Sequence, residues 1–111
     1  MKTFGATIRT LRQEKQISLR KFAEKVGISP TYQSKIERGE FPPPSEETVR
    51  KMARTLEQDE DTLLGLAGKV ASDLPKIVQR RPGIMPLLVR TASKLSDEKL
   101  QKMIKQMQRM Q

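Results

Sequence analysis

The side chains best suited to chemistry in this sequence are cationic. Lys and Arg number 22 against 13 Asp and Glu, which gives a net charge of +9. This excess favours a polyanionic partner, with nucleic acid ahead of an anionic membrane surface. The charge is also uneven, because residues 1–38 carry +6, residues 39–68 carry −4 and residues 69–111 carry +7. Such segregation is typical of a docking surface.

The residue types that are absent narrow the possible reactions. The chain has no Cys and no His, which excludes disulfides, thiolate or imidazole metal sites, Cys nucleophiles and His-dependent triads. The acidic residues Glu57, Asp59, Glu60 and Asp61 lack the Gly and the terminal Glu of a calcium loop. No nuclease-like cluster of carboxylates and Lys is evident either. We therefore predict no enzymatic activity, no catalytic residue, no metal site and no cofactor.

The apolar runs are too short for a membrane protein. The longest, Ile84 to Val89, spans six residues and contains Pro86, whereas a membrane-spanning helix needs about 20 residues. The first ten residues are polar and charged, so no secretory leader is expected. We expect a cytoplasmic protein without a membrane partner.

Helical spacing of apolar residues recurs along the chain, and no segment shows the alternation of a strand. Five helices are predicted first: residues 3–15, residues 19–26, residues 30–38, one helix after Ser45 and one after Asp59. Ser18, Ser29, Ser45 and Asp59 are natural N-caps. Gly27 and Gly39 end the second and third helices.

Four residues indicate how the second and third helices meet. Ala23 lies where the next helix must cross closely, so a small side chain suits it. Gly27 is free to adopt the left-handed backbone that turns the chain sharply. Ile28 and Ile36 can then anchor the third helix on the first two. The result is a helix-turn-helix, whose second helix can enter the major groove of DNA.

The segment from Ile17 to Glu40, ISLRKFAEKVGISPTYQSKIERGE, resembles the helix-turn-helix of the XRE family, the Cro/repressor type of prokaryotic and phage regulators. The resemblance covers residues 4–68. Its most specific parts are Ala23, Gly27, residues 29–32 and residues 36–40.

The resemblance implies a five-helix, lambda-repressor-like, all-α domain over residues 1–68, with double-stranded DNA as its partner. One position departs from the family, because Gln33 stands where Leu or Ile usually faces the core. Gln33 is therefore either partly exposed or makes a polar contact.

The resemblance also implies that Pro30, Thr31 and Lys35 occupy base-reading positions, and Tyr32 lies in the same turn. A Lys can bond guanine O6 and N7, and a Thr methyl group can pack against thymine. One alternative is that Lys35 contacts only phosphate. Tyr32 can stack or bond a phosphate, or its ring can lie on the second helix.

Phosphate contacts are expected from the edges of the motif. Ser18 begins a helix, where backbone N–H groups suit a phosphate. The other expected phosphate contacts are Arg20, Lys21, Ser34 and Arg38. For Arg20 and Lys21 the alternative is an ordinary solvated surface.

Arg12 and Glu37 are expected to have a structural role. The matching positions of the family form a buried ion pair that links the first helix to the third. The resemblance therefore implies that Glu37 orients Arg12, which does not itself contact DNA.

Residues 69–111 resemble no domain that we can name, and they are predicted to form a helical extension. Helices are expected at residues 73–80, 82–95 and 97–110. The last helix carries an apolar stripe, made of Leu100, Met103, Ile104, Met107 and Met110. Because such short helices are marginal alone in water, the stripe must be buried against another surface.

Three surfaces can bury this stripe: a second copy of the chain, the protein's own helices, or a partner protein or membrane. We predict the homodimer, because helix-turn-helix domains commonly read pseudo-palindromes as two-fold dimers. The predicted function is a transcriptional repressor that binds a pseudo-palindromic operator. The alternative is an antitoxin or another protein-interaction module that acts through the C-terminal helices. Non-specific nucleoid or RNA binding would instead show steep salt dependence without sequence preference.

Overall fold

Eight helices and no strand make up residues 3–111, the part of the chain that the computed structural model describes. The prediction of an all-α protein is confirmed. The chain divides into two compact units, Met1–Ala71 and Ser72–Gln111. The first unit extends beyond the predicted limit at residue 68, because Ala71 is buried and belongs to the core of that unit.

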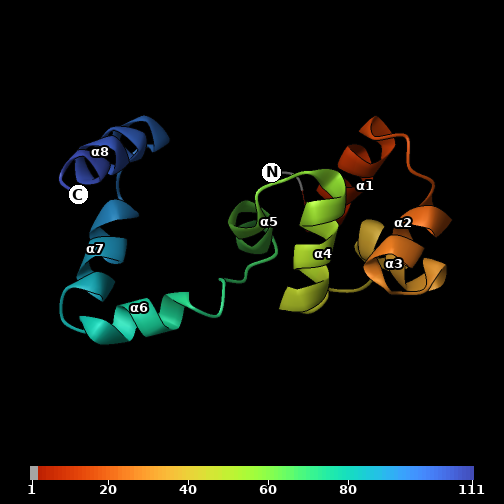
Figure 1. Ribbon diagram of the computed structural model, residues 1–111, viewed down its shortest axis with the longest axis horizontal. Helices are drawn as coiled ribbons and strands as arrows, with labels where there is room; N and C mark the ends of the chain where they lie inside the picture. Colours follow the sequence, from red (N-terminus) through yellow and green to blue (C-terminus); the bar gives the residue numbers. More distant parts are fainter. Residues whose placement is uncertain (1–2) are drawn as a thin grey trace. The chain divides into compact units, whose positions relative to one another are not determined.

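The first unit contains five helices, which follow the predicted segments closely (Figure 1). They are α1 (Phe4–Glu14), α2 (Leu19–Val26), α3 (Pro30–Glu37), α4 (Glu46–Leu56) and α5 (Glu60–Leu66). At each N-cap a side-chain oxygen accepts a hydrogen bond from the backbone N–H three residues further on. These caps are Thr3, Ser18, Ser29, Ser45 and Asp59. Each cap satisfies one of the free N–H groups at the start of its helix and so fixes where the helix begins.

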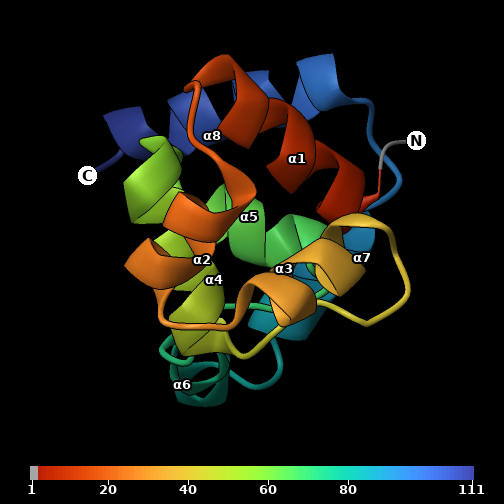
Figure 2. The ribbon, with the colours of Figure 1, turned by 90° about the vertical axis from the view of Figure 1, so that its right-hand side faces the viewer.

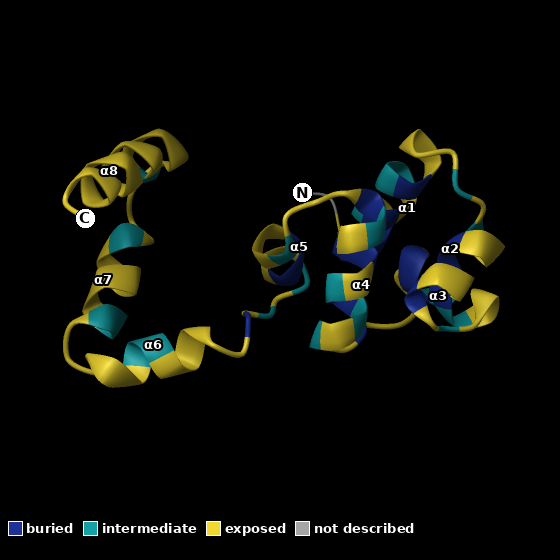
Figure 3. Ribbon diagram, viewed as in Figure 1, coloured by how far each residue is buried: buried dark blue, intermediate teal, exposed yellow. Residues whose placement is uncertain are grey.

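The core of the first unit is formed by the inward faces of all five helices (Figure 3). α4 lies at its centre and packs against α1, α2 and α5, while α3 packs against α1 and α2. Phe22 of α2, Ile36 of α3 and Met52 of α4 are almost fully buried. Burial of each such side chain contributes about 1.5–3 kcal/mol, so the core holds the short α3 in place.

The turn between α2 and α3 has the geometry that the sequence predicted. Gly27 has a φ of 80°, in the left-handed region. The N–H of Gly27 donates to the carbonyl of Glu24, and the N–H of Ile28 donates to the carbonyl of Ala23. Ala23 is fully buried. The chain therefore turns within the three residues 27–29, and Pro30 begins α3 directly after the Ser29 cap.

A second glycine allows α1 to approach α3 closely. Gly5 is buried in the first turn of α1. A Cβ atom built there would overlap the backbone carbonyl oxygen of Ile36 and lie 3.0 Å from that of Glu37. Only a residue without a side chain fits, so the spacing between α1 and the end of α3 depends on Gly5.

The second unit contains α6 (Leu74–Arg80), α7 (Met85–Ala92) and α8 (Asp97–Arg109). None of these helices buries a residue. α7 is shorter than the predicted span of residues 82–95. Pro82 and Gly83 form a turn instead, in which the N–H groups of Ile84 and Met85 donate to the carbonyl of Arg81.

No helix within residues 3–111 combines the length and the apolar composition that crossing a membrane requires.

Candidate nucleic-acid interface

α3 has one face in the core and one face toward solvent. Gln33, Ile36 and Glu37 are buried, whereas Pro30 and Thr31 are exposed and Tyr32, Ser34 and Lys35 are half-buried. The Ser29 hydroxyl accepts a hydrogen bond of 3.1 Å from the Tyr32 N–H and fixes the first turn. The residues predicted to read bases therefore lie on the accessible part of a helix that is anchored from behind.

The loop that follows α3 leads to α4 (Figure 2). It carries Phe41, whose ring lies near Tyr32 and Lys35 of α3. The Lys35 ammonium lies 5.0 Å from the ring centroid of Phe41. The Tyr32 and Phe41 rings are tilted by 57° with their centroids 5.9 Å apart. Phe41 was not predicted from the sequence. Its only signal is that it is one of three Phe in a chain with one Tyr and no Trp, four residues after the end of α3.

The residues predicted to contact phosphate lie around the two helices. Ser18, Arg20 and Lys21 are exposed at the start of α2, where the Ser18 hydroxyl accepts a hydrogen bond of 3.1 Å from the Lys21 N–H. Arg38 is exposed just after α3, and its Nη2 lies 2.9 Å from Glu40 Oε2. A phosphate would therefore compete with Glu40 for Arg38.

A hollow of about 160 Å³ opens between α1, α2 and α3. Its lining residues are Arg9, Arg12, Leu19, Ser34, Glu37 and Arg38. Ser34 and Arg38 were predicted to contact phosphate, whereas Arg9 was not. Arginine is well suited to a phosphate oxygen because its planar guanidinium can donate two parallel hydrogen bonds. Because Arg9 lines this hollow, it is a further residue that a phosphate bound there would contact.

Arg12 and Glu37 form a buried, bidentate ion pair between α1 and α3. Arg12 Nε lies 2.8 Å from Glu37 Oε2 and Arg12 Nη2 lies 3.0 Å from Oε1. Arg12 Nη1 also donates to the carbonyl of Ile17 at 2.8 Å. The arginine therefore ties α3 both to α1 and to the segment before α2.

Gln33, the residue that departs from the family pattern, is fully buried. Of the two possibilities for this residue, the structure has the polar contact, because Gln33 Nε2 donates to Glu37 Oε2 at 2.7 Å. Its Oε1 atom is buried and has no hydrogen-bond partner among residues 3–111. The amide nitrogen of Gln33 is therefore hydrogen-bonded, whereas its amide oxygen is not, within the described part of the chain.

The acidic residues of α4 and α5 have a structural role. Arg50 lies 3.0 Å from Glu46 and 3.3 Å from Glu60, which joins the two helices. The hydrogen bond that Arg50 donates to Glu46 is the largest cause that raises the pKa of Arg50. Asp59 caps α5, and hydrogen bonds from the backbone and then the side chain of Thr62 lower its pKa. Within residues 3–111 no group of three or more acidic side chains is placed to hold a metal ion.

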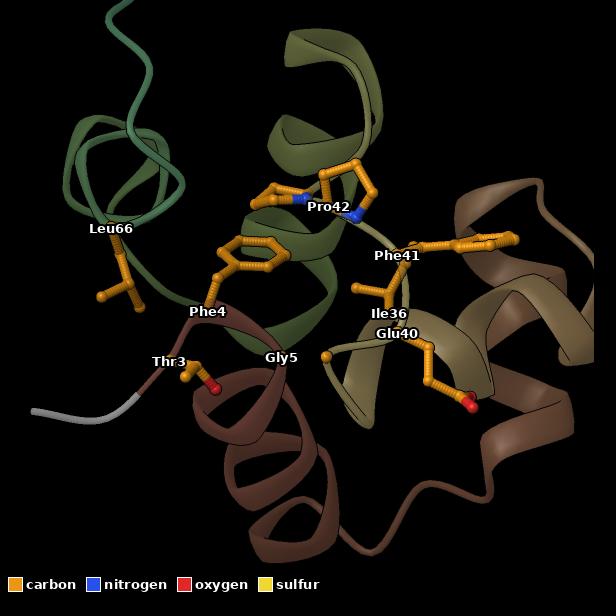
Figure 4. A pocket seen from close by; sticks show the side chains of 10 residues that line it. Thr3, Phe4, Gly5, Ile36, Glu40, Phe41, Pro42 and Leu66 are labelled. Atoms are coloured by element: carbon orange, nitrogen blue, oxygen red, sulfur yellow. The ribbon is translucent and has the colours of Figure 1, made fainter.

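A larger hollow, of about 480 Å³, lies between the start of α1, the end of α3 and α5 (Figure 4). Phe4, Ile36 and Leu66 contribute apolar side chains, and Glu40 is the only charged residue in the lining. Figure 4 shows the Phe41 ring directed away from Phe4 and Leu66. Phe41 therefore borders this hollow without filling it.

The predicted apolar stripe on α8 is largely exposed. Met103, Ile104, Met107 and Met110 have exposed fractions of 46%, 47%, 39% and 81%, and Leu100 is half-buried. Within the second unit, α7 and α8 border an open apolar hollow of about 350 Å³. It is lined by Leu88, Val89, Thr91, Ala92, Leu95, Leu100, Met103, Ile104 and Met107. Met110 is not part of this lining.

The tight turn between α2 and α3, the core that anchors α3 and the polar accessible face of α3 define a helix-turn-helix protein. The family model of the helix-turn-helix domain matches residues 3–64, and the chain belongs to this family. Its relatives place it among the XRE-type transcriptional regulators, as the motif in the sequence predicted.

One such relative is RghRB of Bacillus subtilis (strain 168), an uncharacterized HTH-type transcriptional regulator. It is 33% identical over 70 residues, which cover 63% of this chain and 50% of RghRB, so the chain spans about half the length of that protein. The structure of SinR in complex with DNA is 37% identical, with a TM-score of 0.52, over 56% of this chain and 98% of that chain. The complex of the SinR and SinI proteins matches at 26% identity, with a TM-score of 0.54, over 96% of this chain and 95% of that chain.

Proposed function

We propose that this protein is a transcriptional regulator that binds DNA sequence-specifically through α3. The observation that carries the proposal is the accessible face of α3, which presents Thr31 and Lys35 while Ile36 and Glu37 anchor the helix from behind. A helix of this kind fits the major groove of B-DNA, where each base pair displays a distinct pattern of donors and acceptors. The likeness to SinR, which was solved in complex with DNA, supports the same reading.

The base contacts follow from the chemistry of the accessible residues. Lys35 would donate to guanine O6 and N7, and the Thr31 methyl group would contact a thymine methyl group. Pro30 and Tyr32 complete the surface that faces the base edges. A good bidentate base contact discriminates by about 1–3 kcal/mol, so one or two such contacts define a preferred half-site.

The phosphate contacts position α3 in the groove. Ser18, Arg20 and Lys21 at the start of α2, together with Ser34 and Arg38 near the end of α3, would hold the DNA backbone on both sides of the motif. The exposure of the three basic side chains supports this role. Such contacts add affinity but carry no sequence information.

The second unit is proposed to form the homodimer. Its helices bury no residue, and the apolar hollow of α7 and α8 lies open. Pairing of two copies would bury Leu100, Met103, Ile104, Met107 and Met110 and would place two α3 helices on one duplex. The operator would then be a pseudo-palindrome with half-sites about 34–36 Å apart or a multiple of that distance.

Repression is the proposed consequence of binding. An operator that overlaps a promoter would be covered by the dimer, and polymerase would be excluded. The resemblance of residues 17–40 to the helix-turn-helix of the Cro/repressor type of regulators supports this step.

Selection of bound sequences from random duplex DNA tests the proposal. The complete chain is mixed with the library at about 150 mM salt, where non-specific phosphate binding is weak. We expect an enriched inverted repeat. The Lys35→Met variant should lose the preference at one position of each half-site, whereas Lys21→Gln should weaken binding to all sequences alike. Binding without enrichment that disappears as the salt concentration rises would refute the proposal.

A protein-interaction role, such as that of an antitoxin, is the second candidate, and the exposed apolar hollow of α7 and α8 favours it. Substitutions separate the two. If Thr31 and Lys35 variants lose function in cells, DNA reading is essential. If only Leu100, Ile104 and Met107 variants lose function and the copies do not pair, a partner protein is the target.

A further inference from the structure

We propose that Phe41 determines specificity by positioning the ammonium group of Lys35, and this inference rests on the proposed function. Phe41 is absent from the motif that the resemblance singled out. In the structure its ring nevertheless lies under the Lys35 side chain, with Nζ 5.0 Å from the centroid. Attraction between a cation and the face of an aromatic ring is expected at this distance.

The backbone after α3 fixes the place of Phe41. Gly39 has a φ of 77°, which ends α3 with a left-handed residue. The N–H groups of Glu40 and Phe41 both donate to the carbonyl of Lys35, at 2.9 and 3.3 Å. The backbone of Lys35 therefore holds the backbone of Phe41, which keeps the Phe41 ring close to the Lys35 ammonium group.

The residues on both sides limit the movement of the ring. Phe41 is followed by Pro42, Pro43 and Pro44, whose ring-closed backbones have little freedom, and Pro44 is buried. On the other side the Tyr32 ring lies 5.9 Å away and itself packs against the core. Phe41 is 43% exposed, so its ring remains at the surface. Its neighbours on both sides nevertheless hold it in place.

Phe41 changes what Lys35 is able to read. A free lysine has four flexible bonds and donates as readily to neighbouring phosphates as to a base. A ring beneath the ammonium group holds the side chain over α3 and lowers the entropy that is lost when it binds one base. With the ring in place, Lys35 therefore distinguishes more strongly between the correct and the incorrect base pair at the position that it contacts.

The test compares the complete wild-type chain with Phe41→Leu, which keeps the bulk but removes the aromatic face, and with Phe41→Tyr, which keeps both. Lys35→Met identifies the base pair that Lys35 reads. The probes are the duplex selected from the random library and its single-base-pair derivatives. Phe41→Leu should lose about two- to fivefold of the discrimination at that base pair and none elsewhere. Phe41→Tyr should keep the wild-type profile.

Two further measurements exclude a purely structural effect. Thermal unfolding and the slope of affinity against salt concentration should be the same for Phe41→Leu and the wild type. In the free protein, the ring-current shift of the Lys35 side-chain protons in the NMR spectrum should be present in wild type and Phe41→Tyr and absent in Phe41→Leu.

The outcomes separate this inference from the proposed function. Unchanged discrimination at the Lys35 base pair in Phe41→Leu overturns the positioning role. An equal loss for all sequences, together with a lower unfolding temperature, also overturns it. If the wild type itself shows no sequence preference, the proposed function fails, while the NMR shift still reports whether the ring holds Lys35.

Discussion

Gln33 and Arg12 bind the same oxygen atom. Gln33 Nε2 donates to Glu37 Oε2 at 2.7 Å, and Arg12 Nε donates to that oxygen at 2.8 Å. The second carboxylate oxygen of Glu37 accepts from Arg12 Nη2. The charge of Glu37 is therefore already neutralised by a bidentate arginine, and the amide of Gln33 is an additional donor inside the core.

Replacement of Gln33 by Leu should stabilise the protein. Gln33 Oε1 is buried without a hydrogen-bond partner among the described residues, and such a group costs about 1–3 kcal/mol. Leu removes this cost but also removes the hydrogen bond to Glu37, so we expect a net gain of about 1 kcal/mol. Chemical denaturation of the two proteins measures the difference. A lower free energy of unfolding in Gln33→Leu would mean that the hydrogen bond to Glu37 outweighs the unpaired oxygen.

Removal of Arg12 should have the opposite effect. Among residues 3–111, Arg12→Met leaves the buried carboxylate of Glu37 with Gln33 as its only remaining side-chain donor. Breaking a buried pair in this way costs about 3–5 kcal/mol. Chemical denaturation is again the measurement. The matched control is the double variant Arg12→Met with Glu37→Leu, which removes both charges and should recover most of the loss. Failure of the double variant to recover stability would assign the loss to two broken hydrogen bonds: the one from Arg12 to the Ile17 carbonyl, and the one from Gln33, whose buried amide loses its acceptor Glu37.

The two glycines at 5 and 65 give a matched pair of substitutions. Gly5→Ala places a methyl group against the backbone of Ile36, which has no flexible end that could give way. We expect a loss of about 1–3 kcal/mol from this overpacking. Gly65 lies in α5 with nothing within 4 Å of the added Cβ, so Gly65→Ala should gain about 0.5–1 kcal/mol from helix propensity. Equal unfolding temperatures for the two variants would contradict the close contact between α1 and α3.

Asp59 should make stability depend on pH in the acid range. Hydrogen bonds from Thr62 lower the pKa of Asp59 below the ordinary value of 3.8. The unfolded state therefore binds the proton more readily, and stability rises with pH across this range. The contribution of Asp59 to the stability of the fold is fully present at pH values above 3.8, the ordinary pKa. It is lost as the pH falls through the lower pKa of Asp59 in the folded state.

The control for this effect is Asp59→Asn, which keeps an oxygen that can cap α5 but does not titrate. Unfolding temperatures measured between about pH 2 and pH 6 should rise less steeply with pH in the variant than in the wild type. Parallel curves would show that Asp59 does not contribute to the acid sensitivity of the protein.

The helices of the first unit were predictable because their ends are local signals. Ser18, Ser29, Ser45 and Asp59 each cap a helix within four residues of sequence, and Gly27 supplies the one backbone conformation that the turn needs. The base-reading positions on α3, at Pro30, Thr31 and Lys35, were instead predicted from the resemblance to the XRE family.

Other features were not predictable because they arise between distant or competing residues. Phe41 reaches Lys35 only after a glycine has reversed the chain. Nothing in the spacing around Gly5 reveals that α3 will pass against its backbone. Arg9 joins the small hollow only when α1 and α3 are packed together. α7 was predicted too long at both ends, because Pro82 and Gly83 form a turn before it and residues 93–95 leave the helix after Ala92.

The apolar stripe of α8 should be required for self-association. Ile104 lies in the stripe and in the hollow of α7 and α8, whereas the neighbouring Lys105 is not among the lining residues. A Glu at position 104 would be buried in an apolar interface without a partner, so Ile104→Glu should raise the dimer dissociation constant by at least about tenfold. Lys105→Glu is the control and should leave it unchanged.

Sedimentation equilibrium of both variants measures the dissociation constant, and circular dichroism checks that α8 still forms. In DNA binding, Ile104→Glu should lose affinity for the complete inverted repeat but keep the wild-type affinity for an isolated half-site, because α3 is untouched. A dimer that survives Ile104→Glu would remove the stripe from the interface. A wild-type chain that is already monomeric would assign the stripe to a partner protein, since the exposed residues of α8 would then have no second copy to cover them.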